Sequence, residues 1–216
     1  MHKKLKQSYY ILFALSILVT NRLRAQNEIW KPIENKTSFE SQFQKIASQT
    51  NTFYSPFHQL KTLSLLMEDI ESEGEFWFKK DRKIRLEYQK PFHHLLIIDG
   101  EMVTIEENDK VSKIDGNSNQ LFRKIGDLIM SCIEGKVLTS KNFKPTILES
   151  NKKYKIILET LNKSWRSSIK VIELEFEKKN YVLFSIKLIE PSGDSTLIQF
   201  LNPKLNEAIN NATFKK

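Results

Sequence analysis

The chain has 216 residues, 34 basic and 26 acidic, one cysteine and a formal charge of +8. Five basic and no acidic residues lie in the first 25 positions, which leaves 29 basic against 26 acidic, a charge of +3, for the remainder. So small a charge gives little support to nucleic-acid binding, and a lone cysteine excludes an internal disulfide, so stability must come from a hydrophobic core.

The first 25 residues have the architecture of a cleavable secretory signal peptide. A basic head precedes an apolar run from Tyr9 to Val19, and a polar stretch ends at Ala25, where we place the cleavage. The run is about half the ~20 residues that a membrane-spanning helix needs. We therefore expect an exported protein in which residues 26–216 form one domain, because no Pro-, Gly- or Ser-rich linker divides them.

The first predicted element after the signal is a short amphipathic helix. Ser38 is expected to cap it. Its apolar residues recur at three-to-four spacing and are Phe39, Phe43, Ile46 and Ala47. From Phe53 onward the pattern changes to extended, aromatic and β-branched runs. The acidic stretch 68–73 is expected to be a solvated turn or a strand edge.

Strands follow in the middle of the chain. Residues 76–80 form one, and Ile84, Leu86 and Tyr88 alternate with charged residues, which is typical of a half-buried strand. Asp99-Gly100 predicts a hairpin between 95–98 and 102–105, and Asp115-Gly116 repeats this turn chemistry.

A second amphipathic helix is predicted between Ser118 and Gly135, with Gly135 as its stop. Its apolar stripe consists of Leu121, Ile125, Leu128, Ile129, Cys132 and Ile133. Strands are then expected at 154–160, 169–177, 182–190 and 195–201. Many adjacent strands with only two helices indicate a mostly β (α+β) fold, an antiparallel sheet whose face the helices cover.

Catalytic or metal-binding residues are hard to find in this sequence. His93 and His94 are adjacent and point to opposite faces of a strand, so they cannot chelate one metal, and His58 lies far away in the chain. Cys132 is expected to be an unreactive core residue. No glycine-rich phosphate loop and no nucleophile elbow is present, so we expect no enzyme activity, no metal and no cofactor.

The segments 74–80 and 84–88, together with Pro91 and Asp99-Gly100, resemble the central motif of the periplasmic outer-membrane lipoprotein carrier family. The resemblance implies an incomplete antiparallel β-barrel whose concave apolar face is covered by amphipathic helices. It also implies a monomeric periplasmic chaperone that binds lipoprotein acyl chains and carries them from an inner-membrane release complex to an outer-membrane acceptor. The alternative is an envelope sensor or scaffold of the same fold that binds a protein partner and transfers no lipid.

The predicted acyl-chain cavity rests on strand alternation and on the resemblance to the carrier family. Strand alternation places Phe76, Phe78 and Lys80 on one face and Trp77 and Lys79 on the other. The predicted cavity residues are Phe76, Phe78, Ile84, Leu86, Phe39, Phe43, Leu128 and Ile129. Ordinary core packing explains each of these residues equally well. The resemblance assigns Lys80 the place of an arginine that latches the helical lid, and lysine, as a point charge, lacks the planar fork of arginine.

Overall fold

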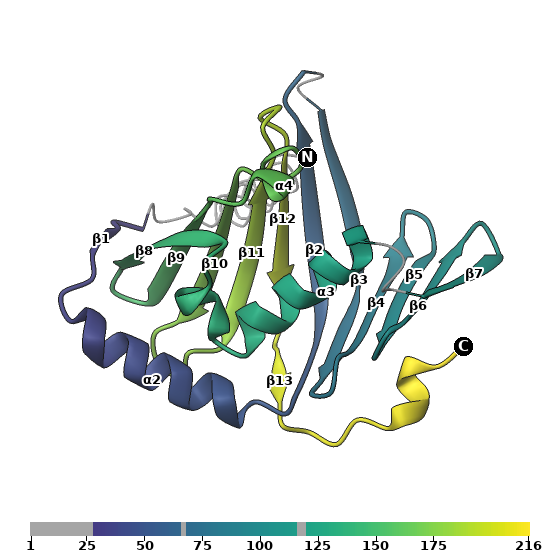
Figure 1. Ribbon diagram of the computed structural model, residues 1–216, viewed down its shortest axis with the longest axis horizontal. Coiled ribbons are helices and arrows are strands. Elements are labelled where there is room, and N and C mark those ends of the chain that lie inside the picture. Colours follow the sequence, from purple (N-terminus) through teal and green to yellow (C-terminus); the bar gives the residue numbers. More distant parts are fainter. Residues whose placement is uncertain (1–27, 66–67, 116–119) are drawn as a thin grey trace, which may run out of the picture.

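The computed structural model describes residues 28–65, 68–115 and 120–216. These residues form a 13-stranded antiparallel sheet that curls without closing, with helices against it (Figure 1). The predicted fold class, an incomplete antiparallel barrel with helices, is confirmed. The predicted signal peptide, residues 1–25, lies outside the described residues.

The sheet order is β1-β8-β9-β10-β11-β12-β2-β3-β4-β5-β6-β7, and β13 pairs with β2. All pairs are antiparallel, as hairpins with short turns require. The strands are β1 (Lys31–Pro32), β2 (Thr52–Leu63), β3 (Glu68–Lys79), β4 (Lys83–Lys90), β5 (His94–Asp99), β6 (Met102–Glu107), β7 (Lys110–Asp115), β8 (Phe143–Glu149), β9 (Lys153–Thr160), β10 (Val171–Glu177), β11 (Leu183–Ile189), β12 (Ser195–Phe200) and β13 (Lys204–Leu205).

Strands β2 and β3 form the longest hairpin of the sheet, and it projects beyond the neighbouring strands (Figure 1). The acidic stretch belongs to β3, but β4 ends opposite Glu73, so residues 68–72 pair with β2 alone. They form a solvated strand edge, one of the two predicted alternatives. The predicted β5–β6 hairpin is also present, and Gly100 adopts φ +63 in its turn.

The alternation along β3 separates two layers of packing. Phe76 and Phe78 are buried in the main core, whereas Trp77 packs on the outer face of the sheet. There it contacts a small second core in which Phe214, from the C-terminal turn η2 (Asn211–Phe214), is covered. The C-terminal turn η2 thus packs on the outer face of β4 and β5. Figure 1 shows the segment that leads to it passing below the lower ends of the central strands.

Helix α2 (Lys36–Gln49) begins two residues before the expected cap. Asn35 is the N-cap, and its Oδ1 accepts a hydrogen bond of 2.9 Å from the backbone N–H of Ser38. The prediction that Ser38 caps the helix was therefore wrong, because both residue types suit the cap position and Asn35 comes first. Of the four predicted apolar residues of α2, Phe39, Phe43 and Ala47 are buried and Ile46 is half-buried.

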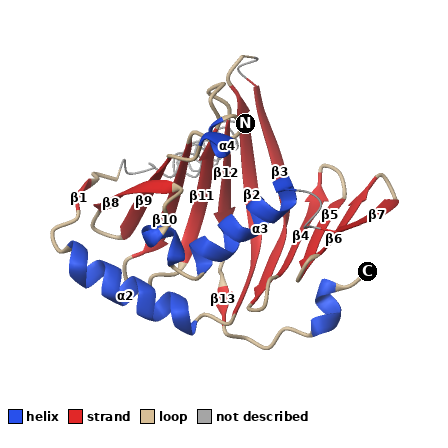
Figure 2. Cartoon of the chain, viewed as in Figure 1, coloured by secondary structure: helices blue, strands red, loops and turns tan. Residues whose placement is uncertain are grey.

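Helix α3 (Gln120–Ile133) crosses in front of the central strands (Figure 2). It ends at Ile133, and Gly135, the predicted stop, follows two residues later with φ +72. A Cβ at this glycine would lie 2.9 Å from the Cβ of Ala47, so the end of α3 lies directly against α2. The side chains of Leu121 and Ile125, and Gly116 of the second Asp-Gly turn, lie outside the described residues.

Two short helices complete the fold, η1 (Lys136–Thr139) directly after α3 and α4 (Lys163–Arg166) between β9 and β10. Within the described residues, no helix combines the length and apolar character needed to cross a bilayer.

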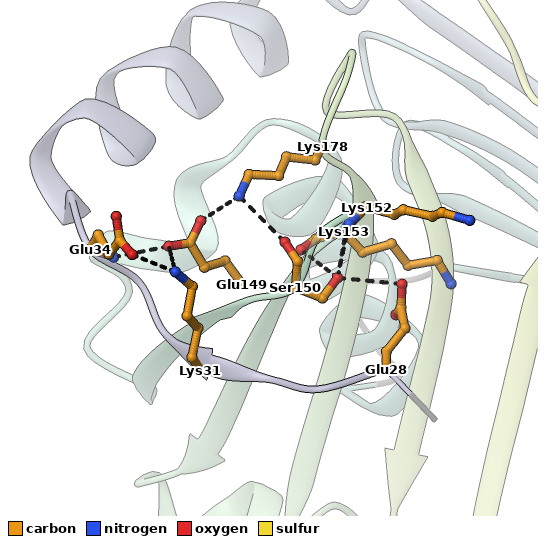
Figure 3. A network of polar contacts seen from close by, with 8 residues as sticks. All are labelled: Glu28, Lys31, Glu34, Glu149, Ser150, Lys152, Lys153 and Lys178. Atoms are coloured by element: carbon orange, nitrogen blue, oxygen red, sulfur yellow. Dashed lines mark hydrogen bonds and ion pairs between the residues drawn. The ribbon is translucent and has the colours of Figure 1, made fainter. Parts of the chain in front are cut away.

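The segment before α2 is held to the sheet edge by a polar network around Glu149 (Figure 3). The Glu149 carboxylate accepts hydrogen bonds from Lys178 Nζ at 2.5 Å and from the backbone N–H of Glu34 at 3.2 Å. Ser150 Oγ lies 3.3 Å from Glu28 Oε1. The hydrogen bond from Lys178 is the main cause that lowers the pKa of Glu149, so this buried carboxyl is held in its charged form.

Candidate functional site

A cavity of about 550 Å³ lies between α3 and the concave face of the sheet. This volume falls within the ~300–1,000 Å³ typical of small-ligand sites. Strands β2, β3, β4, β10, β11 and β12 form its wall, and α3 and the α4 region cover it. The lining residues are Gln59, Phe76, Leu86, Tyr88, Leu128, Ile129, Cys132, Ile133, Trp165, Ser168, Ile169, Ile172, Leu183, Ile186, Leu188, Thr196, Ile198 and Phe200.

The cavity wall is almost entirely aliphatic and aromatic. Among the described residues no Asp, Glu, Lys, Arg or His lines it. Its polar groups are those of Gln59, Tyr88, Ser168 and Thr196, together with the indole of Trp165 and the thiol of Cys132. Such a space favours hydrocarbon, since each buried methylene gains ~0.8 kcal/mol.

Four of the predicted cavity residues line this space: Phe76 and Leu86 on the sheet, and Leu128 and Ile129 on α3. Phe76 and Leu86 face each other across β3 and β4, which explains why both reach it. Residues of the sequence motif thus line the sheet side of the cavity, and residues of the apolar stripe of α3 line its helical side.

The other four predicted residues lie away from the cavity. Phe78 and Ile84 form a cross-strand pair with no exposed surface and are packed on all sides. Phe39 and Phe43 pack against aromatic rings of the sheet: Phe39 meets Tyr154 at 4.7 Å, and Phe43 meets Phe176 at 4.9 Å between ring centroids. Alternation gives the face of a side chain, but its position along the strand decides whether it reaches the cavity.

Most of the wall comes from residues that the sequence had marked only as strand positions. Ile172, Ile186, Leu188 and Ile198 face inward on β10, β11 and β12. Period-two alternation in these strands was visible in the sequence, but it does not distinguish cavity wall from filled core. Trp165, on α4, packs edge-on against Phe143 at 5.9 Å between ring centroids and also lines the cavity.

Cys132 lies on the cavity side of α3 with 3% of its surface exposed. Burial raises the pKa of its thiol to about 12, so the thiol stays protonated and unreactive in the folded protein.

Lys80 follows β3 in the turn before β4 and contacts α2. Its Nζ donates a hydrogen bond to the backbone carbonyl of Ser48, in the last turn of the helix, where the dipole favours a cation. The tie to α3 is made by a different residue of the same turn. Arg82 Nη1 lies 2.6 Å from Asp127 Oδ1, which joins the turn to the helix that covers the cavity.

The three described histidines each lie beside a separate glutamate. His58 is 3.4 Å from Glu71 and His93 is 3.2 Å from Glu87, while the nearest carboxylate to His94 belongs to Glu107. Over the described ranges, no three His, Cys, Asp or Glu side chains converge in a way that could hold a metal ion.

Comparison with known proteins finds similar structures at low sequence identity. They include a LolA superfamily protein from Nitrosomonas europaea (8% identity, TM-score 0.44, covering 83% of this chain and 96% of that one). A conserved protein from Thermus thermophilus is similar at 9% identity and a TM-score of 0.49, covering 83% of this chain and 91% of that one. The lipoprotein LppX of Mycobacterium tuberculosis is similar at 10% identity and a TM-score of 0.43, covering 79% of this chain and 95% of that one.

No curated protein shows significant sequence similarity to the chain. A family match, in contrast, covers most of it: residues 48–216 match the family described as outer membrane lipoprotein carrier protein LolA. The matched range includes β2 to β13, α3 and thus the whole cavity wall. The chain therefore belongs to the LolA family of lipoprotein carriers.

Proposed function

We propose that this protein binds the acyl chains of lipoproteins, or of related lipids, in the cavity beneath α3 and carries them between membranes. The observation that supports the proposal is the cavity itself, about 550 Å³ lined almost wholly by apolar side chains. A filled core of the same strands would have no room for a ligand.

Binding and release in this proposal need no covalent chemistry. Acyl chains enter when α3 moves aside and leave when an acceptor binds them more tightly, because a ligand shifts an equilibrium only by its differential affinity. The tie that holds α3 suits such movement, since Arg82 and Asp127 are 43% and 51% exposed and such pairs are weak.

We place the protein in the periplasm after export, acting as a monomer without metal or cofactor. Its partners are an inner-membrane complex that releases lipoproteins and an outer-membrane acceptor that receives them. The family membership supports this assignment, together with the signal peptide predicted in residues 1–25.

The test uses purified protein lacking residues 1–25 and inner-membrane vesicles that contain lipoproteins. We expect the protein to release lipoproteins in soluble form and to bind a fluorescent fatty acid at one site. Ile198→Glu puts a charge into the cavity wall and should abolish both activities. Leu197→Glu, the next residue on the opposite face of β12 beside Lys187, is the matched control and should retain both.

The alternative of a sensor or scaffold gives different results. The carrier proposal would be contradicted by two results together. The protein would neither release lipoproteins nor bind the fatty acid, and it would bind an envelope protein equally well with and without Ile198→Glu.

A further inference from the structure

One polar side chain, Gln59 of β2, stands out within the apolar cavity wall. Its Oε1 accepts a hydrogen bond of 2.8 Å from the hydroxyl of Tyr88, which also lines the cavity. Burial raises the pKa of Tyr88 to about 12, so this hydroxyl keeps its proton and remains a donor. The bond fixes the amide, with its oxygen toward Tyr88 and its NH₂ group away from it.

The NH₂ group of Gln59 has no protein acceptor among the residues that the structure describes. Within the same part of the chain, the hydroxyl of Thr196, another lining residue, has no hydrogen-bond partner. An amide donor destabilises the complex when apolar groups cover it without a hydrogen-bond partner. A ligand that fills the cavity must therefore supply an acceptor here or lose affinity.

Strand register brings these two groups together. Gln59 is opposite Ile198 and Thr196 is opposite Lys61, so Gln59 and Thr196 are diagonal neighbours on the inward face of β2 and β12. Lys61 continues that face toward the tip of the β2–β3 hairpin, and among the described residues no carboxylate lies within 4.0 Å of its Nζ. Polarity thus increases toward the hairpin tip, and the polar end of a ligand belongs on that side.

We propose that the amide of Gln59, with Thr196 beside it, hydrogen-bonds the carbonyl that joins an acyl chain to its headgroup. The ligands selected are then ester- or amide-linked acyl lipids, with their chains below Gln59 and the headgroup toward Lys61. The inference rests on the proposed function, because it requires that lipid chains occupy the cavity.

The test compares two short-chain phosphocholines that share headgroup and chain length but differ in linkage, one with two acyl esters and one with two alkyl ethers. The ether linkage has no carbonyl group to accept the hydrogen bond from Gln59. We expect the wild-type protein to bind the ester about threefold to tenfold more tightly, the factor of one added hydrogen bond, measured by displacement of a fluorescent fatty acid. Equal affinities would overturn the inference and leave the carrier function standing, whereas failure to bind either lipid would remove the carrier function itself.

Gln59→Leu tests the residue. It should abolish the ester preference, so that ester and ether bind equally, because no amide donor is left either to pair with the carbonyl or to be covered by the ether without a partner. Gln199→Leu, the same substitution on the opposite face of the sheet, should retain the ester preference. An undiminished ester preference in Gln59→Leu would refute the role of this amide. The wild-type comparison holds even if this variant does not fold.

Discussion

Replacing Arg82 by Met should make helix α3 lift from the cavity more often. Met keeps an apolar stem and removes the guanidinium, whose Nη1 lies 2.6 Å from Asp127 Oδ1. Both side chains are about half exposed, and such pairs contribute ~0.2–1 kcal/mol. Removing the pair should therefore raise the population of the lifted state about 1.4- to 5-fold.

Cys132 provides the assay for this movement. It is the only cysteine of the chain, it is buried on the cavity side of α3, and its raised pKa of about 12 keeps it protonated. An uncharged thiol reagent should react with it mainly when α3 lifts and the thiol regains its ordinary pKa of ~8.5. The labelling rate then follows the population of the lifted state, so Arg82→Met should be labelled about 1.4- to 5-fold faster at low salt.

Two controls separate this effect from general loosening. Lys80→Met removes the neighbouring cation, which binds the carbonyl of Ser48 in α2, and should leave the labelling rate unchanged. At 1 M salt the Debye length falls to about 3 Å, so wild type should approach the rate of Arg82→Met. Equal rates for wild type and Arg82→Met at low salt, or equal acceleration by Lys80→Met, would refute the reasoning.

Three further predictions concern other parts of the molecule. Gly74→Ala should lower the free energy of unfolding by about 1–3 kcal/mol in denaturant titrations, because the new Cβ would lie 2.2 Å from the carbonyl oxygen of Glu87 and 2.7 Å from the Phe57 ring; an unchanged midpoint would contradict this. The pKa of Glu149 is lower in the folded state, so its contribution to stability is complete above its unfolded pKa and is lost as pH falls through the folded pKa. The melting temperature of Glu149→Gln should therefore fall less steeply than that of wild type below pH ~4.5, and parallel curves would argue against this. A bound acyl lipid should slow the labelling of Cys132 in wild type, since the thiol lines the cavity, and labelling that is insensitive to saturating lipid would place the ligand elsewhere.

The fold class could be predicted from local pattern, because alternation and turn chemistry act over a few residues. Ile84, Leu86 and Tyr88 indicate a half-buried strand, and Asp99-Gly100 permits the positive φ that its hairpin turn needs. The stripe of α3 and its stop at Gly135 were likewise evident, as was the inward face of Phe76 and Phe78.

The limits of the cavity depend on contacts between distant segments. Phe76 lines the cavity. Phe78, two residues further along the same face, does not, because side chains fill the space at that end of β3 and leave it fully buried. The tie to α3 falls to Arg82 and not to Lys80 because the turn directs them to different helices, which only the three-dimensional path of the chain decides. Sequence periodicity thus determined which residues face inward. Tertiary structure decided which of them enclose empty space, since a cavity is a property of all its walls together.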